Sequence, residues 1–557
     1  MDNILVINAN EYLVDGIRDG KENSAKKNSE AWKEILRFIH NLNDESVVKI
    51  SVPKGTFYCD STLKIPSNTI VEGKSKEKTK IIFTKPVPGV QFEVNNLVPT
   101  GEIEAKNITL QNIGFSYDDI GDDARVSVIE FSKKYLEEYK EYKSFENIKL
   151  NNIHVNGNEF GTSLIFLGGI TGLIINNSII ENAGLQNGVV LEYCDNVVIE
   201  NNTIRNTGRT GIQLYRGNGS PKENDIIIRK NHVSKWMQRY GSHYYIKLGM
   251  KDIMADAGID SYGPNNMNAL IEENVLEAGE GETEKNPCNV IISEHLGKSG
   301  FQSTTLYTGI RLSGLIDAKV YKNEVTLNSA DSFAFLTANS RERSGNTTKP
   351  DNLTILNNHL TSSGTIRFPI RLFDGTACKG RGINIEQNYI NVQGKVANFY
   401  RTLIENRLES EIITVTDNQL KTFKPNGEPA DDASIVSYLV SANQKITTLV
   451  IWGNDVPSGV NEVFQLNKVE NIYTGNARYS PTNSYIKGVI NNNEGYYKQL
   501  LLLIDEIPIR RADINSDNGS FQVYDTGGIS PNSNILLRFQ TDASKYYESE
   551  MIVHYVE

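Results

Sequence analysis

The sequence of 557 residues has few cysteines, no long apolar run and no excess of basic residues. Its four cysteines, Cys59, Cys194, Cys288 and Cys378, show no CxxC spacing, which argues against a zinc site and a dense disulfide framework. We therefore expect free, buried thiols. No apolar run approaches the roughly 20 residues that span a bilayer, so we expect no membrane partner. The net charge of −11 disfavours nucleic acid as a partner, because phosphate binding requires a basic surface.

The most informative feature that is present is a repeat, in which a short alternating strand ends on asparagine. The repeat aligns eleven asparagines, namely Asn112, Asn152, Asn177, Asn202, Asn231, Asn274, Asn323, Asn358, Asn388, Asn418 and Asn454. Their spacing ranges from 25 residues (152 to 177) to 49 (274 to 323), which indicates a fixed coil with inserted loops. Asparagine tolerates the left-handed backbone of a tight corner, and stacked amides can hydrogen-bond between coils. The pattern predicts a parallel β-helix solenoid.

A second strand recurs in residues 188–192, 211–215, 258–262, 309–313 and 369–373. If its second position faces inward, its third and fifth positions face outward, because side chains alternate along a strand. The third positions are Val190, Gln213, Asp260, Arg311 and, after a poorly matching coil near Ala334, Arg371; the fifth positions include Glu192, Tyr215 and Tyr262. Carboxylates, guanidinium groups and aromatic rings in outward rows are typical of a sugar-binding face. A solvated face with one ion pair is the alternative.

Two adjacent coils carry long insertions on either side of Asp260. Ile212 and Ile259 are 47 positions apart and Ile259 and Ile310 are 51 apart, whereas Val189 and Ile212 are only 23 apart. Long loops on a rigid scaffold are commonly functional, so we expect these two to wall a groove. The first loop carries Trp236, Tyr240, His243, Tyr244, Tyr245, Asp252 and Asp256, and the second carries Glu280, Glu282, Glu284, Glu294 and His295.

Glycoside hydrolysis usually needs two carboxyl groups on opposite sides of the scissile bond. Asp260 is the first candidate, with Asp256 or Glu294 as its partner. Asp256 is equally well explained as a turn residue, and Glu294 is the weaker candidate, because loop acids are usually solvated. The candidate substrate-binding residues are Arg311, Gln213, Tyr215, Tyr262, Glu192, Arg371, His295 and His243. No spacing suggests a metal site, so we expect neither metal nor cofactor, although acidic loops can hold calcium without a recognisable signature.

The N-terminal stretch Val52-Pro-Lys-Gly-Thr-Phe-Tyr58, followed by residues 61–73 (STLKIPSNTIVEG), resembles the opening of pectate-lyase-like β-helix proteins, especially bacteriophage tail spikes. The resemblance covers roughly residues 8–475 and is specific for fold but poor for reaction. It implies a right-handed parallel β-helix, a homotrimer, a virion location beside other tail proteins, and a bacterial capsule, exopolysaccharide or wall teichoic acid as partner. Residues 1–6 lack a secretory signal pattern, which fits release by lysis.

The predicted fold class is all-β, with a capping helix before the solenoid and a small β-domain after it. Residues 29–42 place Trp32, Ile35 and Ile39 at helical spacing, which predicts an amphipathic helix that covers the open end of the solenoid. We expect the first coils within residues 1–95, the β-helix with the substrate face in 96–475, and a C-terminal β-domain for trimerisation or binding in 476–557.

Three functional hypotheses follow from this pattern. The leading one is an extracellular, virion-borne depolymerase that hydrolyses a bacterial surface polysaccharide. The second is a lyase of the same fold that uses Lys247, Arg311 or His295 as a base on a uronic acid. The third is a non-catalytic fibre or adhesin, in which the aromatic residues would matter and the carboxylates would not.

Overall fold

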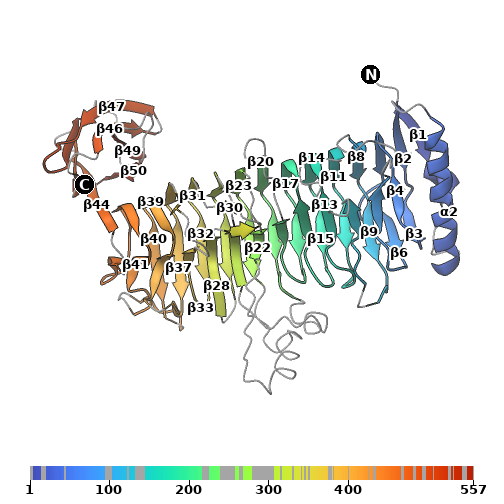
Figure 1. Ribbon diagram of the computed structural model, residues 1–557, viewed down its shortest axis with the longest axis horizontal. Helices are drawn as coiled ribbons and strands as arrows, with labels where there is room; N and C mark the ends of the chain where they lie inside the picture. The colour runs from blue at the N-terminus through green and yellow to red at the C-terminus, as the bar shows by residue number, and fades with distance from the viewer. Residues whose placement is uncertain are drawn as a thin grey trace, which may run out of the picture.

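The computed structural model is an elongated stack of short strands, with a helix at its N-terminal end and a smaller group of strands at its C-terminal end (Figure 1). It describes residues 4–555 except 14–20, 43–45, 94–102, 122–123, 132–144, 216–224, 239–256, 263–267, 279–306, 314–316, 329–330, 340, 344–345, 349–351, 374–378, 381, 399, 425, 431–433, 466–468, 481–484, 492, 494–496, 506, 525–528, 531 and 542–548. No helix within this described part is long and apolar enough to cross a membrane.

Three long sheets run along the stack, and each coil of the chain adds one parallel strand to each sheet. Sheet A contains β1 (Ile4–Asn8), β2 (Val47–Ser51), β5 (Thr69–Glu72), β8 (Ala105–Gln111), β11 (Phe145–Asn151), β14 (Ile170–Asn176), β17 (Asp195–Glu200), β20 (Asp225–Arg229), β23 (Asn268–Glu272), β26 (Lys319–Tyr321), β31 (Leu353–Leu356), β35 (Lys379–Gly380), β36 (Ile383–Glu386), β39 (Glu409–Thr416), β42 (Ile446–Trp452) and β44 (Val469–Ser480), which C-terminal strands extend.

Sheet B contains β3 (Gly55–Cys59), β6 (Thr79–Phe83), β9 (Gly114–Tyr117), β12 (His154–Asn156), β15 (Ile179–Glu181), β18 (Thr203–Arg205), β21 (His232–Ser234), β24 (Val275–Ala278), β27 (Glu324–Leu327), β32 (His359–Ser362), β37 (Tyr389–Gln393) and β40 (Gln419–Phe423). Sheet C contains β4 (Leu63–Ile65), β7 (Val90–Phe92), β10 (Ile129–Phe131), β13 (Ile165–Gly168), β16 (Val189–Glu192), β19 (Ile212–Tyr215), β22 (Ala257–Tyr262), β25 (Tyr307–Ser313), β28 (Asp331–Asn339), β33 (Thr365–Ile366), β34 (Ile370–Phe373), β38 (Thr402–Asn406), β41 (Tyr438–Ala442) and β43 (Asn461–Gln465). The predicted solenoid is therefore confirmed.

A buried asparagine ladder lies at the corner between sheets A and B. From Asn202 to Asn418, the backbone and side-chain amides of each member donate to Oδ1 of the next asparagine, and Asn454 ends the series. The predicted alignment was wrong by one position for its first three members. Asn112, Asn152 and Asn177 hold the left-handed corner, which Asn201 and Lys230 take in later coils, and Ser178 begins the ladder itself.

Glycine lies just before or near the start of several sheet C strands because the coils stack too closely there for a side chain. A Cβ at Gly211 would lie 2.4 Å from a methyl group of Val233 and 2.7 Å from the carbonyl oxygen of Gly258. At Gly309 it would lie 2.6 Å from the carbonyl oxygen of Phe335. These close approaches explain the glycine that opens four of the five recurring segments in residues 188–373.

The helix predicted in residues 29–42 is present as α2 (Lys21–His40), which begins eight residues earlier and follows the short 3₁₀ helix η1 (Ala9–Glu11). It packs against β3 and β4 at the N-terminal end of the stack (Figure 1). Trp32 is buried in the core of the solenoid, and its indole Nε1 donates to the carbonyl oxygen of Lys64 at 3.1 Å. Its function as a cover of the solenoid end stays a prediction.

The C-terminal strands form antiparallel sheets that differ from the solenoid. β44 pairs with β45 (Tyr485–Asn491), which pairs with β48 (Ser520–Tyr524), and β51 (His554–Tyr555) joins β44 in parallel. A four-stranded sheet contains β46 (Tyr497–Ile504), β47 (Ile507–Asp513), β49 (Ile535–Thr541) and β50 (Ser549–Ile552). These strands have their own hydrophobic cluster, to which the solenoid contributes Trp452. β44 crosses residue 476, and the division into three domains stays a proposal.

The described strands also include one two-stranded sheet outside the three long sheets. Two of the cysteines lie in the solenoid core. A hairpin joins β29 (Arg341–Arg343) to β30 (Asn346–Thr348). Cys59 is a free, buried thiol, as predicted, and burial raises its pKa. Cys194 is also buried, and its Sγ donates to the carbonyl oxygen of Leu167 at 3.8 Å. Cys288 and Cys378 lie outside the described residues.

Candidate functional site on the outer face of sheet C

The register of sheet C brings together the residues that the sequence alignment placed in one row. Gln213 pairs with Asp260, and Asp260 pairs with Arg311, on adjacent strands. We call the full series the outer row: Val190, Gln213, Asp260, Arg311, Thr337, Arg371, Glu405, Ser441 and Phe464. The flanking residues Ile259 and Ile310 belong to the solenoid core, so the outer row faces away from that core.

The predicted alignment was wrong at one coil of this row. The sequence placed the next match near Ala334, but Arg311 pairs with Thr337, and Ile310 pairs with Leu336. The cause is the length of β28, which spans Asp331–Asn339, together with an irregularity in its pairing with β25 between Tyr307 and Thr308. Arg371 then follows Thr337 in register, as one further rung.

Asp260 is held by its two neighbours in the outer row. Nε of Arg311 donates to Oδ1 of Asp260 at 2.7 Å, and Nη2 donates to Oδ2 at 2.6 Å. Nε2 of Gln213 donates to Oδ2 at 3.2 Å, and Oε1 of Gln213 accepts from Nδ2 of Asn187 at 2.9 Å. The side chain of Asp260 has 0% exposed surface, and that of Arg311 has 19%. Asp260 therefore faces outward, as the alternation along the strand predicts, but it is covered.

Several strands in the middle of sheet C are buried on both faces. In many strands of sheets A and B the burial of side chains alternates, as in β17 and β37, although β42 of sheet A is also buried on both faces. Every residue of β16 and β38 is buried, and so are Gln213, Thr337 and Ser441 in the outer row. Glu192, a predicted binding residue, is also buried, at the end of β16. A covered polar row on one face of a solenoid is a candidate site, because unpartnered polar groups are costly to bury.

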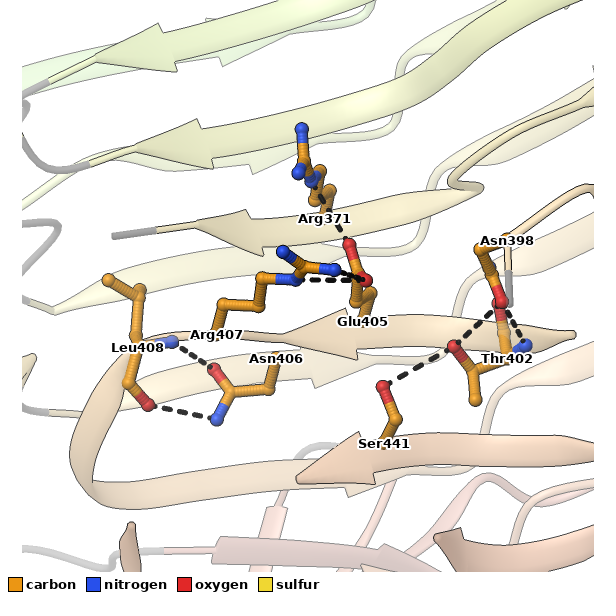
Figure 2. A network of polar contacts seen from close by, with 8 residues as sticks. All are labelled: Arg371, Asn398, Thr402, Glu405, Asn406, Arg407, Leu408 and Ser441. Carbon is orange, nitrogen blue, oxygen red and sulfur yellow. Dashed lines mark hydrogen bonds and ion pairs between the residues drawn. The ribbon is translucent and has the colours of Figure 1, made fainter. Parts of the chain in front are cut away.

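A second polar cluster begins at Arg371, two rungs beyond Arg311. Figure 2 shows Arg371, Glu405 and Arg407 of this cluster. Nε of Arg371 donates to Oε2 of Glu405 at 3.0 Å, and Nε of Arg407 donates to Oε1 of Glu405 at 3.0 Å. The guanidinium carbon of Arg371 lies 4.3 Å from the ring centroid of Phe368 and 5.5 Å from that of Phe333. Burial lowers the pKa of Arg371, and Glu405 opposes that shift. The side chain of Glu405 is 5% exposed, so the guanidinium groups lie nearer the solvent.

The outer row ends on an aromatic group. Phe464 stacks on Tyr400 with ring centroids 4.2 Å apart and an interplanar angle of 26°, and Tyr438 meets Phe464 edge-on at 5.0 Å. Sequence reasoning identified Arg371 but missed Glu405, Arg407 and this aromatic group, because residues 402–406 (TLIEN) lack the Gly-Ile opening used for the alignment. These residues are recognised by an outward position in the strand register combined with partial burial of the side chain. The sequence alone did not supply that signal.

The other carboxyl groups of the same register are distant from Asp260. Glu130, whose pKa is raised by burial, pairs with Phe166 and lies four rungs before Asp260, and Glu405 lies four rungs after it. Four rungs span about 19 Å. Glycosidases place their two carboxyl groups roughly 5–9.5 Å apart. Neither residue can therefore serve as the second carboxyl for Asp260.

Several predicted site residues cannot be placed. Asp256, Glu294, His243 and His295 lie outside the described residues, as does Lys247. For Tyr215 and Tyr262 only the backbone is described, and it pairs the two residues on adjacent strands. Trp236, which the sequence assigned to the first long loop, is a core residue with a fully buried ring, so that assignment was wrong. The described residues contain no group of three or more metal-ligating side chains.

Residues 96–276 match a family model described as "Right handed beta helix region". A comparison with curated protein sequences gives no match. Among solved structures, the chain is similar to the A-module of mannuronan C-5 epimerase AlgE4 from Azotobacter vinelandii, with 12% identity, a TM-score of 0.45 and coverage of 84% of this chain and 99% of that chain. It is also similar to a tailspike protein of E. coli bacteriophage HK620, with 10% identity, a TM-score of 0.44 and coverage of 96% and 94%.

A third solved structure is the surface protein and adhesin PfbA of Streptococcus pneumoniae, with 12% identity, a TM-score of 0.44 and coverage of 84% of this chain and 99% of that chain. The fold assignment rests on the observed strand register and on the family model, which agree over residues 96–276. The chain therefore contains a right-handed β-helix region, and its fold is the right-handed parallel β-helix.

Proposed function

We propose that the chain binds a bacterial surface polysaccharide along the outer row of sheet C and hydrolyses it, as a tail-spike depolymerase. The observation that carries the proposal is the outer row itself. It joins two guanidinium–carboxylate clusters and an aromatic group on one face. From Gln213 to Phe464 the row has eight members, which span roughly 34 Å at the spacing of parallel strands. That length suits several sugar units of a polymer.

The chemistry of the row suits a glycan. Arg311 and Arg407 present partly exposed fork-shaped donors that pair with oxygen acceptors on sugars. Phe464 and Tyr400 supply half-buried ring surface for the apolar faces of sugar rings. The proposed polymer is a capsule, an exopolysaccharide or a wall teichoic acid.

Hydrolysis requires more than binding. Asp260 remains the proposed catalytic carboxyl, and Asp256 and Glu294 remain its proposed partners. Because Arg311 occupies both oxygens of Asp260, a substrate has to displace Arg311 or open the covered site before it reaches the carboxylate. The same contacts favour a second candidate function, a binding spike without catalysis, in which Asp260 orients Arg311 towards the glycan.

The test of catalysis compares the protein with its Asp260→Asn variant on surface polysaccharides from a panel of bacteria. Reducing ends should form without absorbance of unsaturated uronates, and Asp260→Asn should slow their formation at least a hundredfold, as expected for loss of an acid–base group. Absorbance would mean a lyase. Glu200→Gln is the matched control, because Glu200 pairs with Arg229 across two strands of sheet A. Full activity of Asp260→Asn would reject the proposed catalytic site.

We further propose that the chain assembles as a homotrimer on a phage virion, beside other tail proteins. The support is the sequence resemblance of residues 52–58 and 61–73 to tail spikes. Sedimentation equilibrium of the purified chain should give three times the mass of one chain at micromolar concentration. A monomer mass at that concentration would contradict the trimer.

A further inference from the structure

Thr337 lies between two guanidinium-bearing residues of the outer row. It pairs with Arg311 on one side and with Arg371 on the other. The Cα atoms of the two arginines are therefore roughly 10 Å apart, at two rungs of parallel strand spacing. Leu336 and Ala338, the neighbours of Thr337 along β28, belong to the solenoid core, so the Thr337 side chain faces the same way as the two arginines.

The hydroxyl group of Thr337 is buried without a hydrogen-bond partner. The residue is 2% exposed, and its Oγ1 has no partner among the described residues. A buried hydroxyl without a partner destabilises the folded chain. Thr414 in sheet A shares this state, but its register partners are Asn384 and Val450, so it has no arginine beside it. Thr337 differs from Thr414 in having a guanidinium-bearing residue on each side.

The charges of this region are layered. The carboxylates of Asp260 and Glu405 are 0% and 5% exposed, whereas the side chains of Arg311, Arg371 and Arg407 are 19%, 17% and 45% exposed. Three guanidinium groups against two carboxylates leave one net positive charge, in a chain whose total charge is −11. The positive groups form the outer layer, and the carboxylates and the ring of Phe368 hold them in fixed orientations.

We propose that Arg311, Thr337 and Arg371 form a subsite for an acidic group of the bound glycan, a carboxylate or a phosphate diester. The oxyanion lies between the two guanidinium groups and accepts a hydrogen bond from the Thr337 hydroxyl, which then gains its missing partner. Arginine forks match the geometry of both oxyanions, and charge-assisted bonds are the stronger class. This inference rests on the proposed polysaccharide-binding function and adds to it that the polymer is anionic.

The test measures binding to immobilised capsular polysaccharides and exopolysaccharides before and after chemical reduction of their carboxyl groups. The protein should bind a carboxylated glycan at least tenfold more tightly than its reduced form.

Thr337→Val is isosteric and replaces only the hydroxyl by a methyl group, so it should fold with an unchanged or higher unfolding midpoint. It should bind the native glycan about tenfold more weakly, as expected for one lost bond to a charged group, and the reduced glycan as the wild type does. Thr414→Val is the matched control and should bind as the wild type does.

Binding of wall teichoic acid tests whether the bound oxyanion is a phosphate diester, because the charge of that polymer survives carboxyl reduction. Inorganic phosphate and sodium glucuronate are the soluble competitors, and the more effective one identifies the oxyanion. Equal affinity for the native and reduced forms of every carboxylated glycan, together with no binding of teichoic acid, would overturn the inference but leave the proposed function standing. Wild-type affinity of Thr337→Val for the acidic glycan would also overturn it. Binding of no glycan at all would instead reject the proposed function.

Discussion

Replacement of Asn323 by alanine should lower the free energy of unfolding by about 3–5 kcal/mol, because several buried groups lose their partners at once. The backbone and side-chain amides of Asn274 donate to Oδ1 of Asn323 at 3.0 and 2.9 Å. Nδ2 of Asn323 donates to the carbonyl oxygen of Ile271 at 2.8 Å and to Oδ1 of Asn358 at 3.0 Å. Alanine removes all four of these bonds and keeps only the bond from its own backbone amide to Oδ1 of Asn358.

The loss is best measured by hydrogen exchange as well as by denaturant unfolding, since a solenoid can open locally. The amide protons of residues 274 and 323 should lose protection in Asn323→Ala. Asn323→Ser should cost less, because Ser178 begins the natural ladder and its Oγ accepts from the backbone amide of Ile153 at 3.1 Å. Asn471→Ala, which removes one exposed side-chain bond, serves as the control and should cost below about 0.5 kcal/mol. A cost below about 1 kcal/mol for Asn323→Ala would show that the ladder is not a major source of stability.

The asparagine repeat predicts the coil but not the position of each asparagine within it. Asn177 and Asn202 both follow a short apolar run, yet the first holds a left-handed backbone and the second donates from within the ladder. The two positions are adjacent, and asparagine is suited to both for different reasons, namely tolerance of the left-handed region and paired amide donors and acceptors. A residue pattern therefore gave the period correctly and the phase incorrectly for the first three copies.

For the candidate site too, the sequence predicts one property of a residue and not another. Alternation along a strand predicts which side Asp260 faces, and the register confirms its pairing with Gln213 and Arg311. Alternation carries no information about what covers that side, and so it did not predict the burial of Asp260. The Glu405 cluster was missed for a related reason: its side chains come into contact across strands whose sequences share no motif with residues 258–262.

Replacement of Arg311 by methionine should also cost about 3–5 kcal/mol in unfolding free energy. The variant leaves the Asp260 carboxylate buried, with Gln213 as its remaining donor among the described residues, and an uncompensated buried charge is strongly destabilising. Denaturant unfolding gives the measurement. Arg229→Met is the control, because its partner Glu200 is 21% exposed and an exposed pair contributes about 1 kcal/mol or less.

The double variant Asp260→Leu/Arg311→Met separates stability from function. Hydrophobic replacement of both members of a buried ion pair is often neutral, so the double variant should regain most of the stability that Arg311→Met loses. It should still bind no acidic glycan, because the guanidinium of Arg311 is absent. Recovery of both stability and binding would mean that the pair is only a structural element and that the glycan binds on another face. Recovery of stability without binding would place Arg311 in the binding site. Asp260 would then be either the positioning partner of Arg311 or the catalytic carboxyl. The activity of Asp260→Asn distinguishes these two roles.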